Sequence, residues 1–101
     1  MKSLLIFLLS VFAVVSGFAQ QKNRLIVLTD IGGDPGDQMS MVRLMTYANH
    51  FDIEGLIATP HGPDHSVEPE YIDCIVTTYG EVRDNLEIHE PGYPTYNHQK
   101  L

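Results

Sequence analysis

The chain has 101 residues, and its 13 acidic residues outnumber its 6 lysines and arginines, which gives a formal net charge of −7. Such an acidic chain is a poor candidate for binding nucleic acid or an anionic membrane surface, because both need clusters of Lys and Arg that neutralise phosphates. Cys74 is the single cysteine, so no disulfide can form within the chain. The length allows one small domain or part of a larger one.

Residues 1–19 predict a secretory signal peptide. Lys2 supplies a short positive start, and residues 4–15 are apolar except for one serine. The small residues of segment 17–19 predict cleavage before Gln20. The alternative is a membrane anchor, but the apolar run is shorter than the roughly 20 residues that a spanning helix needs. We therefore expect an exported protein, periplasmic or secreted, without a membrane attachment after the signal is removed.

Residues 24–29 predict the first β-strand. The apolar residues at 25–28 form a continuous run, which indicates burial on both faces, as in a parallel sheet covered by helices. A helical segment is the competing interpretation. The short run and the break at Gly32-Gly33 that follows it favour the strand.

An amphipathic helix is predicted from Asp37 or Gln38 to about His50. Pro35 and Asp37 suit its start, because proline costs little in a first turn and a carboxylate can cap free backbone N–H groups. Long and apolar side chains recur at helical spacing along one face, with Leu44 adjoining it. That face comprises Gln38, Met41, Val42, Met45 and Ala48.

The second half of the chain repeats this order. Residues 52–59 predict a strand, and the loop 60–67 that follows is rich in Pro, Gly, His and Asp. A helix is predicted over residues 68–86, with Cys74 beside its apolar stripe as a buried, inert thiol. The stripe comprises Ile72, Ile75, Val76, Tyr79, Val82 and Leu86. Residues 87–101 show neither helical nor strand periodicity.

The order strand, helix, strand, helix, with both strands buried, predicts the start of a parallel α/β sheet with right-handed crossovers. Two strands alone do not form a stable sheet of this kind. We therefore expect further strands beyond Leu101 and interpret residues 20–101 as the N-terminal part of a larger domain.

The loop between the first strand and the first helix carries Asp30, Asp34 and Asp37. Ligands of open parallel sheets bind at the carboxyl ends of the strands, so all three carboxylates can face one crevice. Carboxylates held together repel one another unless a cation or hydrogen-bond donors compensate them, and their oxygens suit Ca²⁺ or Mg²⁺. Calcium takes roughly 6–8 oxygen ligands, so other groups would have to complete its shell.

Three well-known motifs do not fit this loop. An EF-hand starting at Asp30 would have Met41 at its last position, where a bidentate acid is required. The glycine spacing is not G-x-G-x-x-G, and the sequence has no Gly-Lys-Ser/Thr, which excludes a dinucleotide fingerprint and a P-loop. The remaining alternative is that Asp30 and Asp37 are turn and cap residues without a ligand.

Residues 24–38, RLIVLTDIGGDPGDQ, resemble the opening of the nucleoside-hydrolase-like family, in the branch found as the N-terminal domain of cellulose-binding proteins. Further similar segments are residues 41–49, 51–58, 79–83 and 91–94. The resemblance implies a Rossmann-like sheet and an enzyme that hydrolyses glycosyl bonds of a carbohydrate or nucleoside-like small molecule by metal-assisted attack of water. The alternative in the same fold is a carbohydrate-binding domain without catalysis.

The resemblance also implies roles for the loop residues. Asp30 matches the family's first aspartate, which binds Ca²⁺ and positions the attacking water, so it is the candidate catalytic base and a metal ligand. Asp37 matches a second calcium ligand. Gly36 stands where the family has an aspartate that contacts sugar hydroxyls, and Asp34 is the candidate substitute that would bind substrate.

His61 is the other candidate for binding substrate. It follows the second predicted strand and could therefore reach the same crevice. The family has a Gly-Asn element at this place, whereas this chain has Thr59-Pro60-His61, so no role carries over from the family. The alternative is a loop histidine without a task.

Overall fold

A computed structural model of the chain describes residues 1–17 and 21–96. The predicted order of strand, helix, strand and helix is confirmed, with a short 3-10 helix, η1, before the second strand. The elements in chain order are α1 (Lys2–Gly17), β1 (Asn23–Thr29), α2 (Pro35–Thr46), η1 (Ala48–His50), β2 (Phe51–Ala58) and α3 (Glu70–His89).

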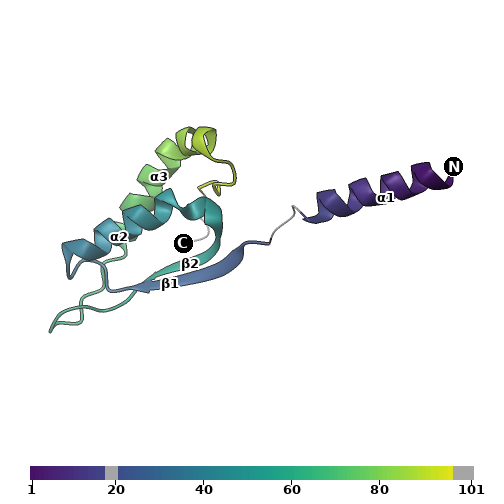
Figure 1. Cartoon of the computed structure of the whole chain (residues 1–101). Coiled ribbons are helices and arrows are strands. Elements are labelled where there is room, and N and C mark those ends of the chain that lie inside the picture. The colour runs from purple at the N-terminus through teal and green to yellow at the C-terminus, as the bar shows by residue number, and fades with distance from the viewer. Residues whose placement is uncertain (18–20, 97–101) are drawn as a thin grey trace.

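Helix α1 projects away from the rest of the chain (Figure 1). Its large apolar side chains from Leu4 to Val11 are exposed. None of the helices in the described part of the chain has the length and apolar character needed to cross a membrane. The predicted cleavage site before Gln20 lies outside the described residues, and the signal peptide stays a prediction.

Strands β1 and β2 pair in parallel, from Asn23 opposite Phe51 to Thr29 opposite Ala58. Parallel neighbours cannot be joined by a tight hairpin, so the chain crosses over through α2 and η1. The register shifts after Leu25, which leaves one extra residue in β2. This two-stranded parallel pair with its crossover helix confirms the predicted α/β class.

Helices α2 and α3 both cover the same face of the sheet (Figure 1). The core between these layers comprises Ile31, Met41, Met45, Ala48, Ile72, Val76, Tyr79 and Tyr93. On the opposite face Ile26, Leu28 and Ile57 are 59%, 66% and 48% exposed. The prediction that both faces of the first strand are buried is therefore wrong for the described residues, because no described helix covers the second face.

The helices also differ from prediction at their edges. Val42, Val82 and Cys74 are exposed, although all three were expected in or beside the buried stripes. All three residues border an apolar groove of about 210 Å³ between α2 and α3. The apolar stripe of each helix is therefore wider than the surface that the other helix covers. Helix α3 continues to His89, three residues beyond its predicted end.

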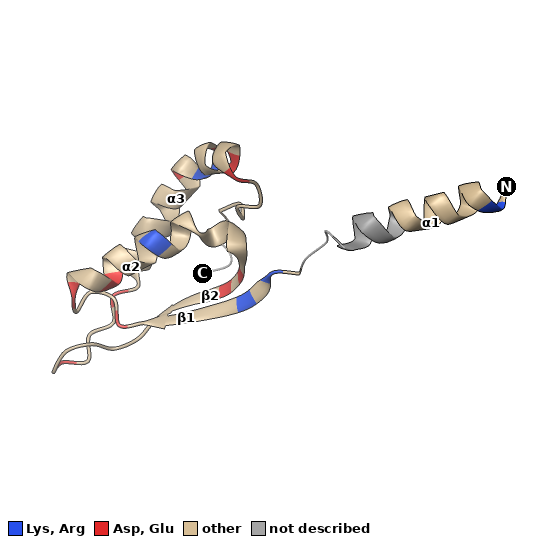
Figure 2. Cartoon of the chain, in the orientation of Figure 1, with Lys and Arg blue, Asp and Glu red and all other residues tan. Residues whose placement is uncertain are grey.

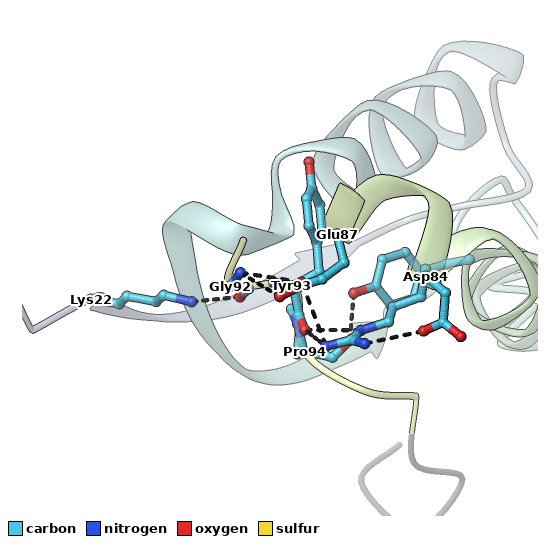
Figure 3. A network of polar contacts seen from close by, with 8 residues as sticks. Lys22, Asp84, Glu87, Gly92, Tyr93 and Pro94 are labelled. Atoms are coloured by element: carbon cyan, nitrogen blue, oxygen red, sulfur yellow. Dashed lines mark hydrogen bonds and ion pairs between the residues drawn. The ribbon is translucent and has the colours of Figure 1, made fainter. Parts of the chain in front are cut away.

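The segment after α3 is held down by a polar network (Figure 3). The Glu87 carboxylate accepts hydrogen bonds from the backbone N–H groups of Gly92 at 3.1 Å and of Tyr93 at 2.8 Å. Arg83 donates to the carbonyl of Tyr93 at 2.7 Å, and the Lys22 ammonium donates to that of Gly92 at 2.6 Å. The buried Tyr93 hydroxyl donates to the carbonyl of Thr46 at 2.6 Å. The segment is thus fixed to α3, to α2 and to the residues before β1.

This network makes stability depend on the charge of Glu87. The backbone hydrogen bonds from Gly92 and Tyr93 lower the pKa of Glu87. A carboxyl whose pKa is lowered on folding stabilises the fold above its unfolded pKa, and that contribution is lost as the pH falls through the folded pKa. We predict that Glu87→Gln lowers Tm at pH 7 and reduces the difference in Tm between pH 7 and pH 3.

Thermal melts of both proteins followed by circular dichroism at the two pH values measure this effect. The matched control is Glu81→Gln, because the Glu81 carboxyl is exposed on the same helix. It should leave unchanged both the Tm at pH 7 and the difference in Tm between pH 7 and pH 3. Equal effects of the two substitutions would contradict the assigned role of Glu87.

Candidate functional site

The acidic loop lies at the carboxyl end of β1, where the sheet passes into α2. Asp30 directly follows β1, and α2 begins at Pro35. Figure 2 shows acidic residues where β1 passes into α2, and it shows basic residues at the opposite end of β1, beside acidic residues of β2. The loop therefore occupies the position where parallel α/β sheets bind their ligands.

Ile31 fixes the loop to the core. Its side chain is completely buried, at 0% exposure, between the exposed Asp30 on one side and the Gly32-Gly33 pair on the other. Burying an isoleucine contributes roughly 1.5–3 kcal/mol. One apolar side chain thus holds a loop whose other members are polar or glycine.

Asp34 caps helix α2. Its backbone is extended, and its Oδ1 accepts a hydrogen bond from the N–H of Gly36 at 3.0 Å, with Pro35 in the first helical turn. Replacing such a cap by alanine usually costs about 1 kcal/mol. The helix therefore begins two residues before its predicted start, at Pro35. The Asp-Pro pair is the sequence signal for this cap, whereas capping was predicted for Asp37.

The three aspartates converge. The pKa of Asp37 is raised by desolvation, then by the charge of Asp30 and a side-chain hydrogen bond with it, and then by the charge of Asp34. His61 acts in the opposite direction and lowers the pKa of Asp37. The structure thus places Asp30, Asp34 and His61 close enough to Asp37 for their charges to act on it.

His61 reaches this place from the loop after β2. An isolated antiparallel β-bridge joins His61 to Ser66, so the chain reverses its direction between them. In this bridge the His61 N–H donates to the Ser66 carbonyl at 2.8 Å. The His61 Nε2 lies 2.5 Å from a carboxylate oxygen of Glu68, and the two side chains are 15% and 31% exposed. Glu68 was interpreted only as the start of a helix. The turn-forming residues between His61 and Glu68 indicated a reversal, but nothing in the sequence paired these two side chains.

Within the described residues, no group of three or more His, Cys, Asp or Glu side chains is arranged so that it could hold a metal ion. Asp30 and Asp37, the two predicted ligands, interact with each other through their carboxyl groups. Their carboxylate oxygens suit a hard cation, and a cation would offset the repulsion that raises the pKa of Asp37. Two carboxylates do not make up a shell for Ca²⁺, which needs further oxygens, so the metal site stays a prediction.

A cavity of about 440 Å³ lies at the opposite end of the sheet, beside Lys22, Phe51 and Tyr96. Its lining combines aromatic, aliphatic, basic and acidic residues and contains none of the four predicted site residues. Tyr93 lies near this cavity in the chain, but it is 7% exposed and packs into the core. The predicted acidic site and this cavity are therefore separate features.

The family described as the nucleoside hydrolase-like domain of the cellulose-binding protein Sde182 matches residues 24–100. The chain belongs to this family. A solved structure with the same fold is a nucleoside hydrolase-related hypothetical protein from Saccharophagus degradans that is associated with carbohydrate metabolism. The two chains are 29% identical, with a TM-score of 0.63. No curated protein matches the chain.

The structural match covers 80% of this chain and 20% of the solved one. The chain therefore spans about one fifth of the length of that relative. The resemblance identified in the sequence is confirmed at the level of the family, and so is the parallel α/β fold.

The convergence of the aspartates predicts a measurable destabilisation. Because the pKa of Asp37 is raised on folding, its charged form opposes folding at neutral pH, and protonation removes that penalty as the pH falls. We predict that Asp37→Asn raises Tm at pH 7 in EDTA and leaves it unchanged at pH 3. Asparagine also removes a favourable charge from the first turn of α2, which acts in the opposite direction.

Differential scanning calorimetry of the two proteins tests this prediction. Asp52→Asn is the matched control, since Asp52 is exposed at the other end of the sheet, and it should leave Tm unchanged. A lower Tm for Asp37→Asn at pH 7 would show that the aspartates do not repel one another.

Proposed function

We propose that loop 30–37 is part of a site that hydrolyses glycosyl bonds of a carbohydrate or nucleoside-like molecule in an exported protein. The observation that carries the proposal is the convergence of Asp30, Asp37 and His61 at the carboxyl ends of two parallel strands. Ligands bind at that edge in folds of this class. The family and its solved relative, which is associated with carbohydrate metabolism, point to sugars as the ligand class.

Asp30 and Asp37 are the proposed ligands of a Ca²⁺ ion. The ion, when bound, would polarise a water molecule and offset the negative charge of the pair. Asp30 is the proposed base that takes a proton from that water, since it is exposed and directly follows β1. The sugar centre that receives the water has oxocarbenium-ion character in reactions of this class.

Asp34 and His61 are the proposed contacts to sugar hydroxyls. One oxygen of Asp34 accepts the capping hydrogen bond, which leaves its second oxygen available to a ligand. His61 is held at the edge of the same loop by Glu68. Both residues offer hydrogen-bonding groups of the kind that bind hydroxyls.

The metal ligands are tested by calorimetric titration of the full chain with Ca²⁺. Even substitutions of residues that only hydrogen-bond to a metal ligand weaken metal binding about 10–100-fold, so losing a ligand should weaken it at least about tenfold. We expect this loss for Asp30→Ala and for Asp37→Ala, and no change for the control Asp52→Ala. Unchanged Ca²⁺ binding in both site variants would refute the metal assignment.

A carbohydrate-binding role without catalysis is the second candidate function. Gly36 favours it, because nucleoside hydrolases place at this position an aspartate that contacts sugar hydroxyls. The description of the matched family as cellulose-binding also favours it.

Product analysis separates the two functions. Hydrolysis predicts release of reducing sugar from cello-oligosaccharides or of free base from nucleosides, and this release should be lost in Asp30→Ala. Retention on cellulose without any released product would instead support the binding role.

A further inference from the structure

His61 and Glu68 form a pair that joins the ends of two elements. His61 follows β2 and Glu68 precedes α3, and their side chains meet with 2.5 Å between Nε2 and a carboxylate oxygen. The loop between them is closed by its own hydrogen bonds, including one of 2.6 Å from the Ser66 hydroxyl to Asp64. The pair is mostly sheltered, with 15% of the His61 side chain exposed. A short contact in a sheltered place fixes the orientation of the imidazole ring.

This pair explains the two adjacent glycines of the acidic loop. Gly32 has a φ of +104°, and a Cβ there would overlap the Glu68 carboxylate and lie 3.0 Å from the His61 Nε2. A Cβ at Gly33 would lie 3.2 Å from the His61 Cγ and 3.3 Å from its Nδ1. The imidazole therefore rests directly on the glycine pair. Side chains at these positions would push it away from the acidic loop.

The contact of Nε2 with Glu68 determines whether the other ring nitrogen, Nδ1, accepts or donates a hydrogen bond. A carboxylate only accepts hydrogen bonds, so Nε2 carries the proton that it donates to Glu68. The neutral ring then presents Nδ1 as an acceptor, and the protonated ring presents it as a donor. No hydrogen bond from the described residues occupies Nδ1. The position of Nδ1 against Gly33 places it at the edge of the acidic loop.

We propose that Glu68 is a positioning residue that holds His61 with its Nδ1 directed to a sugar hydroxyl bound over loop 30–37. This inference rests on the proposed function and adds to it a residue that the sequence did not single out. The ligand chemistry is a hydroxyl of a pyranose or ribose ring, which both a cellulose chain and a nucleoside supply. The carboxylate–imidazole arrangement is the one by which proteins fix the orientation and tautomer of a functional histidine.

The orientation is tested by nuclear magnetic resonance of the ¹⁵N-labelled full chain. A ring N–H that donates to a sheltered carboxylate exchanges slowly with water, so His61 should give a direct Nε2–H signal. His65, which is exposed in the same loop, should give none. Glu68→Ala should abolish the His61 signal, and Glu68→Gln should restore part of it, because the amide oxygen still accepts a hydrogen bond. Glu70→Ala is the matched control, two residues away and exposed, and should leave the signal unchanged.

The role in binding is tested by adding cellopentaose or adenosine to the same sample. We expect one of the two probes to shift the Nδ1 resonance of His61 together with the backbone amides of loop 30–37. Which probe does so identifies the source of the hydroxyl. Glu68→Ala should weaken binding of that probe about tenfold without unfolding the chain, as its amide spectrum will show. Gly33→Ala, which displaces the ring but keeps Glu68, should weaken it as well.

Each contrary result has a distinct meaning. A wild-type chain without a His61 Nε2–H signal overturns the positioning role whatever binds. Amide shifts in loop 30–37 without a shift of Nδ1 overturn the inference and leave the proposed function standing. No shift at all with either probe overturns both the proposed function and the ligand contact of His61.

Discussion

The burial of Ile31 is the constraint on which the rest of the site depends. It is the one large side chain that the described part of the chain buries completely. Three aspartates close together repel one another, and their convergence needs a compensating gain in free energy. The roughly 1.5–3 kcal/mol from burying one isoleucine supplies part of that gain, and the cap formed by Asp34 supplies about 1 kcal/mol more. The acidic loop is thus held by the packing of Ile31 in the core and by the Asp34 cap at the start of α2.

A second constraint comes from the loop after β2. Its bridge from His61 to Ser66 brings Glu68 back to the end of the sheet, and the two glycines of the acidic loop leave room for the resulting pair. The acidic loop and the loop that carries His61 therefore pack directly against each other. Neither loop has a regular secondary structure that could fix it alone. Their contact makes one unit of two segments that lie about thirty residues apart.

The sequence was sufficient for the order of the elements and for the end of β1 as the place where the aspartates lie. Periodicity predicted both strands and both helices, and the end of β1 predicted where Asp30 and its neighbours meet. Periodicity could not predict that Val42, Val82 and Cys74 are exposed. A stripe of apolar residues does not show how much of it a neighbouring helix will cover. The sequence also could not pair His61 with Glu68, because that contact depends on the positive φ values of Gly62 and His65.

The hydrogen bond from Lys22 to the carbonyl of Gly92 has a consequence for the order of folding. It joins residues that are 70 positions apart in the chain, whereas the pairing of β1 with β2 spans fewer than half as many. Distant contacts close the largest loops of chain and form late. Lys22 therefore gains this anchor only after nearly all the described chain has been synthesised, whereas its neighbour Asn23 can pair with Phe51 of β2 much earlier.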